Sequence, residues 1–142
     1  MYKKNLLAKL IISFTLVFFH IVLFAQSKSE TAKLKIKSKT EYKADFVDGN
    51  GKPIIDEKVT FDARGNTISE ITYSAEGKLL TEVRYTYNTA DQVETEEHYK
   101  SNKLTKKFVY KFNDKGLKIS KSEYDSANKL VKTKTFSYEF FQ

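Results

Sequence analysis

The sequence predicts an all-β protein: an antiparallel meander of about eight strands, built from 25–26-residue hairpin repeats and curled into an open sheet or a partly open barrel. Three observations support this prediction. Turn signals recur at regular spacing, residues between turns alternate between apolar and polar, and no run after residue 25 has helical periodicity. The chain has 142 residues, one Pro and no Cys, which indicates one small domain held together without disulfides.

Residues 1–25 are predicted to be a signal peptide. Three lysines precede an apolar run of 16 residues, from Leu10 to Ala25, and polar residues follow. This layout is typical of an export signal, and the run is shorter than the ~20 residues of a spanning helix. Cleavage is expected after Ala25 or as late as Ser27, and an uncleaved anchor is the alternative. We therefore expect an exported protein, in the periplasm, at the cell surface or secreted, which contacts a membrane only if the signal stays uncleaved.

Residues 26–50 are predicted to form a basic lead-in strand and a turn. From Leu34 to Tyr42, every second residue is apolar or uncharged, and its neighbours are lysines or Glu41. This alternation predicts a strand whose outer face is basic.

The hairpin repeats occupy residues 51–142. Gly, Asn or Asp turn signals follow one another at spacings of 14, 12, 14, 11, 14 and 12 residues, so alternate turns lie 25 or 26 residues apart. The first strand of each unit carries aromatic residues in the same columns, and the second strand ends in a tyrosine. The segments 67–74, 92–100 and 117–125 contain fewer apolar residues, so they are expected to be the more exposed strands. The strongest column contains Phe61, Tyr87, Phe112 and Tyr138.

The region from Glu94 to His98 holds the densest carboxylates and the one histidine beyond residue 25. Paired carboxylates can perform glycoside hydrolysis, so a small exported hydrolase is the alternative function. The cluster does not recur in the next repeat, however, and no Gly-x-Ser-x-Gly turn positions a nucleophile. We expect solvated side chains here and no catalytic residues.

Metal and cofactor sites are not expected. One histidine without cysteines cannot build the usual zinc sites, and no glycine-rich phosphate loop is present. The predicted protein is therefore not an enzyme and has no cofactor.

Charge is segregated along the chain. Residues 26–43, 44–99 and 100–142 carry net charges of +4, −7 and +7. Lysines alternate with aromatic residues in the last segment, which suits an anionic polymer. Export argues against nucleic acid, so the expected partner is an anionic glycan or an envelope protein. The alternative is a solvated lysine face that protects strand edges from aggregation. The candidate binding residues are Lys103, Lys106, Lys107, Lys111 and Lys118.

Residues 124–130, Tyr-Asp-Ser-Ala-Asn-Lys-Leu, resemble the Y-D-x-x-G-[RK]-L core of YD (RHS-type) repeats, with looser copies at 73–79 and 112–117. The signal resembles those of Bacteroidota. Two copies lack the Asp, two turns have Asn for Gly, and the period is longer than is usual in the family. Long arrays of that family form β-shells at cell surfaces, with proposed carbohydrate-binding or toxin-enclosing roles. The resemblance thus implies an exported, non-catalytic binding or structural module, although three and a half units cannot enclose a cargo. The turns are also similar to MORN-like repeats of antitoxin-type proteins.

Overall fold

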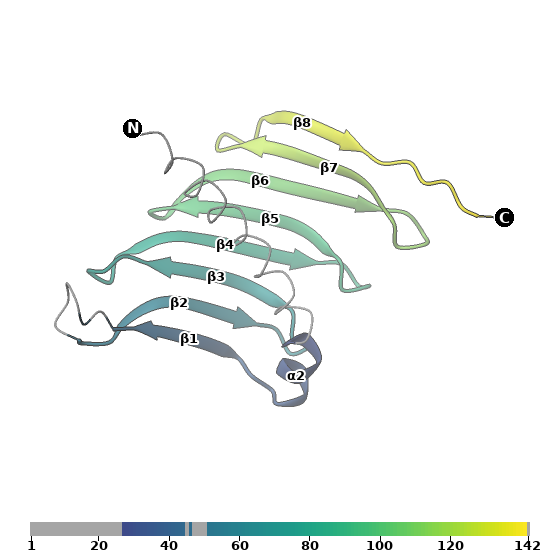
Figure 1. Cartoon of the computed structure of the whole chain (residues 1–142). Helices are drawn as coiled ribbons and strands as arrows, with labels where there is room; N and C mark the ends of the chain where they lie inside the picture. Colours follow the sequence, from purple (N-terminus) through teal and green to yellow (C-terminus); the bar gives the residue numbers. More distant parts are fainter. Residues whose placement is uncertain (1–26, 45, 47–50, 142) are drawn as a thin grey trace, which may run out of the picture.

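The computed structural model describes residues 27–44, 46 and 51–141, which form one eight-stranded antiparallel sheet and one short helix (Figure 1). The strands follow one another in chain order, so the predicted all-β meander is confirmed. Within the described residues β1 and β8 do not pair, and the sheet is open rather than closed. The elements are α2 (Ser27–Lys33), β1 (Ser38–Lys43), β2 (Ile54–Phe61), β3 (Thr67–Tyr73), β4 (Leu79–Tyr87), β5 (Val93–Lys100), β6 (Lys103–Phe112), β7 (Lys118–Asp125) and β8 (Leu130–Thr135).

The predicted signal peptide, residues 1–25, lies outside the described residues, as does Gln26 beside the expected cleavage sites. No helix in the described part of the chain is long and apolar enough to cross a membrane.

The lead-in segment differs from the prediction, because α2 occupies part of it and β1 begins only at Ser38. The helix has Glu30 in its first turn and Lys33 in its last, both favourable for the helix dipole. Its last turn is closed by backbone hydrogen bonds around Lys35, whose φ of 53° is left-handed. With only seven residues, the helix is too short to reveal itself as hydrophobic periodicity.

The turns that connect each even strand to the next odd strand share one geometry. A side-chain oxygen of Asp62, Asn88 or Asn113 accepts hydrogen bonds from the backbone N–H groups two and four residues later. The residue three positions along has a left-handed φ, of 79° at Gly65 and 59° at Asp91. The turns predicted from the sequence at Gly65, Asp91 and Gly116 therefore lie where the structure has them.

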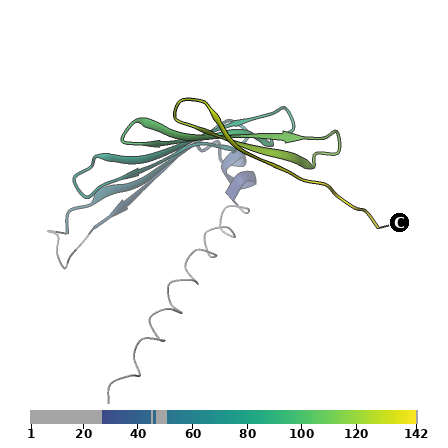
Figure 2. The same ribbon diagram turned by 90° about the horizontal axis from the view of Figure 1, so that it is seen from above.

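β-Bulges recur with the aromatic columns. Register shifts fall next to Phe61, Tyr87 and Phe112 on the even strands. On the odd strands they fall next to tyrosines at the equivalent position, which are Tyr42, Tyr73, Tyr99 and Tyr124. Because a bulge increases local twist, the repeats give the sheet a regular curvature. Figure 2 shows the resulting arch, with α2 on its inner side.

The sheet is a single layer with two different faces. Strand alternation and register place Val59, Val83, Tyr85, Phe108 and Tyr110 on one face, which we call the aromatic face. Three of these, Val59, Phe108 and Tyr110, are the buried hydrophobic residues among those described. No described side chain is less than 2% exposed, so stability depends on contacts within this layer.

The odd strands are not the more exposed ones, contrary to the sequence prediction. β3, β5 and β7 are half-buried along almost their whole length, whereas β4 and β6 expose several side chains. Each of these odd strands lies between two even strands. Neighbouring strands cover its polar side chains, and composition alone does not report this coverage.

Candidate functional site: a lysine–aromatic cluster

Three lysines gather over two buried rings where β6 and β7 form the aromatic face. The Lys121 Nζ lies 3.8 Å from the ring centroid of Phe108 and 5.1 Å from that of Tyr110. Lys118 Nζ is 4.6 Å from the Tyr110 ring, and Lys106 Nζ is 5.2 Å from the Phe108 ring. We call these five residues the lysine–aromatic cluster. An ammonium over a ring face at these distances is attracted by the ring quadrupole.

The β6–β7 hairpin positions the cluster. Lys106, Phe108 and Tyr110 alternate along β6 and therefore share a face. Lys121 stands directly opposite Tyr110 across the strand pair, and Lys118 stands opposite Phe112, just before the bulge on β7. Cation and ring meet because the register pairs them, so a slip of one residue would separate them.

Glu96 on β5 lies beside this cluster on the same face, directly opposite Phe108. The Tyr110 hydroxyl donates a 2.6 Å hydrogen bond to Glu96 Oε2, and His98 Nε2 lies 2.5 Å from Oε1. Burial raises the pKa of Glu96, but these two hydrogen bonds and the charges of His98 and Lys121 outweigh it and hold the pKa below its ordinary value. Glu96 therefore stays ionised. Burial, together with Glu96, also raises the pKa of Tyr110.

His98 is not the solvated side chain that the sequence predicted. Its side chain is only 26% exposed, and its ring meets Phe108 edge-on at 5.5 Å between centroids. The contact with Glu96 fixes its orientation. The residue is part of the polar network beside the lysine–aromatic cluster, on the same face.

The five predicted binding lysines do not lie on one face. Lys106 and Lys118 belong to the lysine–aromatic cluster, whereas Lys107 and Lys111 point to the opposite face by strand alternation. Lys107 forms an ion pair with Glu97 at 3.2 Å. Lys103 begins β6 at the far end of the strand. Adjacent lysines in a strand sequence alternate between faces, so counting lysines along the chain overestimated the basic patch.

Lys121 is the cluster residue that the candidate set omitted. It makes the closest cation–ring contact of the cluster, and its partner Tyr110 is eleven residues away in sequence. Simple mirroring about the turn at 113–117 pairs Tyr110 with Ser120, and the bulge before Phe112 shifts this register by one residue, so that Lys121 stands opposite Tyr110 instead.

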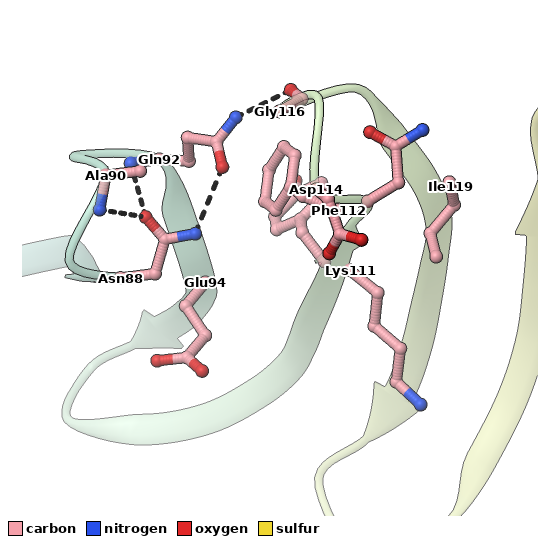
Figure 3. A pocket seen from close by; sticks show the side chains of 11 residues that line it. Asn88, Ala90, Gln92, Glu94, Lys111, Phe112, Asp114, Gly116 and Ile119 are labelled. Atoms are coloured by element: carbon pink, nitrogen blue, oxygen red, sulfur yellow. Dashed lines mark hydrogen bonds between the residues drawn. The ribbon is translucent and has the colours of Figure 1, made fainter.

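A hollow of about 440 Å³ opens beside the cluster, between the turns that follow β4 and β6. Figure 3 shows Glu94 on one side of the hollow and Ile119 on the other, with Gln92 Nε2 donating to the Gly116 carbonyl at 2.7 Å. Glu94 is exposed here, while Glu96 and His98 are engaged with each other beyond the hollow. Glu94, Glu96 and His98 lie on the same face of β5, since they alternate along the strand. In the described part of the chain, no group of three His, Cys, Asp or Glu side chains is placed to hold a metal ion.

Comparisons with known proteins report on architecture alone. No protein-family model and no curated protein sequence matches the chain. The chain is similar to a DUF3836 family protein from Bacteroides vulgatus ATCC 8482, at 17% identity and a TM-score of 0.36, covering 69% of this chain and 98% of that chain. It is also similar to a protein of unknown function from Bacteroides fragilis NCTC 9343, at 17% identity and a TM-score of 0.29, covering 72% and 96%.

The chain is also similar to a small part of a longer chain of known structure. The GtfA/B complex bound to UDP and GlcNAc matches at 13% identity and a TM-score of 0.30, covering 68% of this chain and 19% of that chain. These scores carry no argument about activity.

Proposed function

We propose that this chain is an exported, non-catalytic binding or structural module of YD-repeat-like type, whose aromatic face binds an anionic glycan. The observation that supports the proposal is the lysine–aromatic cluster on a one-layer sheet. Lys106, Lys118 and Lys121 are held at one place by two rings. Lysines fixed in this way lose less side-chain entropy when an anion binds than mobile lysines do.

The chemistry of the cluster fits a sulfated or carboxylated sugar. Ammonium groups attract the anionic substituents, and neighbouring aromatic and apolar surface packs against the faces of sugar rings. Ile119 and the rim of the hollow extend this surface toward the turns. Glu96 and Glu123 on the same face limit the net positive charge. The expected binding is therefore weak and sensitive to salt, since such attraction is screened over ~8 Å at physiological ionic strength.

The test compares two variants with the same change of charge on opposite faces. The first combines Lys106→Gln, Lys118→Gln and Lys121→Gln. The control combines three lysines of the opposite face, as Lys58→Gln, Lys107→Gln and Lys111→Gln. On a heparin-like matrix with a salt gradient, the first variant should elute clearly earlier than the parent and the control.

Two outcomes would contradict the proposal. Equal shifts of the elution position in both variants would mean that net charge alone determines retention. A parent protein that is not retained even at low salt would show that it does not bind an anionic glycan. Circular dichroism of both variants checks that the sheet is retained.

A further inference from the structure

The two edges of the sheet are formed by two different kinds of strand. The odd strands β1, β3, β5 and β7 each have a register shift directly before a tyrosine. In β1 the shift falls between Glu41 and Tyr42, as it falls between His98 and Tyr99 in β5. β1 is therefore a complete odd strand, and the described part of the chain places no even strand before it.

β8 is an even strand that lacks the odd strand after it. Tyr138 donates its hydroxyl to the Lys118 carbonyl at 2.7 Å, as Tyr87 donates to the Thr67 carbonyl at 2.7 Å. The backbone N–H of Phe136 still bonds to the Ile119 carbonyl. The chain thus keeps even-strand geometry beyond the last residue of β8, although the described residues provide no ninth strand.

We propose that β8 of one copy of this chain pairs with β1 of a second copy, so that the repeat continues head to tail across the two molecules. The inference does not depend on glycan binding. Because the interface joins an even edge to an odd edge, each added copy leaves one edge of each kind free, and association continues as an open chain of copies.

The repeat specifies the register of this pairing. Each even strand has an aromatic residue at its bulge, such as Tyr87, and the odd strand after it has a tyrosine at its own bulge, such as Tyr99. In the existing hairpins, the residue three positions before that aromatic residue stands opposite the residue two positions before that tyrosine. Arg84 faces Glu97 in this way, and Val109 faces Ser122. The same rule places Thr135 opposite Thr40 of the second copy.

Side chains in this register are complementary. Lys134 stands opposite Glu41, an opposite-charge pair that stabilises antiparallel strands. Phe136 faces Lys39, repeating the pairing of Tyr110 with Lys121. Phe136 and Tyr138, which are 40% and 44% exposed, would gain cover from the new strand.

Other pairs in this register vary in quality. Thr135 beside Thr40 resembles Thr86 beside Thr95, whose hydroxyls lie 2.7 Å apart. Lys132 opposite Lys43 is the unfavourable pair, and the ion pair of Lys43 with Asp56 offsets part of that repulsion.

The β1 edge is accessible in the described structure. Five of the six β1 residues are exposed. The helix lies over the turns instead, because a Cβ on Gly65 would collide with the Lys28 carbonyl of α2, and Lys28 Nζ lies 3.4 Å from Asp91. Figure 1 shows α2 at the ends of the strands, not along the free side of β1.

Cysteine cross-linking tests the register, since the chain has no Cys of its own. The variants Thr135→Cys and Thr40→Cys are expressed and purified separately, each in the form that the cell produces after any processing. The two residues would form a hydrogen-bonded pair with Cα atoms ~5.5 Å apart, within disulfide range. Under mild oxidation, the mixture should form a mixed dimer, and either variant alone should not.

A matched control shifts one partner by two residues. Thr133→Cys lies on the same face of β8 as Thr135, so it should cross-link to Thr40→Cys much less than Thr135→Cys does. Equal yields from both positions, or a dimer of Thr135→Cys alone at the yield of the mixture, would overturn the proposed pairing.

Sedimentation equilibrium over a concentration series tests the association itself. The N–H of Phe136 points to β7, so that of Thr135 points to the free edge. Thr135→Pro should therefore abolish the association while leaving β8 in place, and Thr135→Ala should preserve it. Lys134→Glu or Glu41→Lys should each weaken it, and the two combined should restore it. A parent that stays monomeric at every concentration would overturn the inference.

Discussion

Two pairs of residues one repeat apart occupy equivalent positions in the sheet and have opposite acid–base behaviour. Glu70 and Glu96 are 26 residues apart, and their partners Tyr85 and Tyr110 are 25 residues apart. In each pair a tyrosine on an even strand donates its hydroxyl to a glutamate on the odd strand before it. Yet burial and the nearby charge of Glu57 raise the pKa of Glu70, whereas the pKa of Glu96 is lowered.

The difference comes from the neighbours of each carboxylate. Glu70 stands between Val59 and Val83, and the Tyr85 hydroxyl lies 3.4 Å away, too far for a strong bond. Glu96 stands between Tyr85 and Phe108 and has short contacts with Tyr110 and His98. The repeat thus determines where a carboxylate lies, and the side chains beside it determine its charge state.

The largest expected difference between the two regions concerns packing. Phe108 is 8% exposed, and Val83, the equivalent residue 25 positions earlier, is only half-buried. Phe108→Ala should lower the free energy of unfolding by about 3 to 5 kcal/mol, the range for a buried aromatic side chain. Val83→Ala should cost clearly less. Urea unfolding of both variants measures this, and equal losses would mean that the two regions contribute alike to stability.

The tyrosine hydroxyls should differ by a smaller amount. Tyr110→Phe removes a 2.6 Å hydrogen bond to an ionised carboxylate, and we expect a loss of about 1.5 to 3 kcal/mol. Tyr85→Phe removes a 3.4 Å contact to Glu70 and should change stability by less than about 0.5 kcal/mol. The same urea experiment measures both. Equal losses would contradict the stronger bonding assigned to Glu96.

The sequence was sufficient to predict the sheet because the fold depends on repeated local features. Turn residues such as Asp62 and Gly65 determine where each hairpin reverses, and period-two alternation identifies each strand. Sequential hairpins then give a meander with few alternatives. The short helix α2 was missed because seven residues carry no measurable periodicity.

The candidate site was predicted only in part, because it depends on cross-strand register. Lys106 and Lys118 were identified from composition, but which lysines share a face with Phe108 follows from alternation and bulges. The half-buried state of His98 likewise comes from its neighbours on β6, not from its own polar segment. The residue pattern along one strand does not indicate which contacts, and how much burial, a side chain gains from the adjacent strand.

The smallest expected effect is also the sharpest test of the comparison, because its sign should reverse between the two regions. A carboxylate with a lowered pKa in the folded state stabilises the protein above its unfolded pKa, and this contribution is lost as the pH falls through the folded pKa. Glu96→Gln should therefore lower stability at pH 7. For Glu70 the folded pKa is raised, so its charge opposes folding at pH 7, and Glu70→Gln should raise stability.

The pH dependence separates this electrostatic effect from a change in packing. Both carboxylates have an ordinary value of 4.5. The stabilisation by Glu70→Gln should fade as the pH falls below the raised pKa of Glu70, because the parent then carries a neutral carboxyl group. The loss caused by Glu96→Gln should persist to lower pH, until Glu96 is itself protonated. Urea midpoints from pH 7 down to acid measure both curves. Changes of the same sign at pH 7 would show that the repeat, not the local neighbours, determines how these carboxylates ionise.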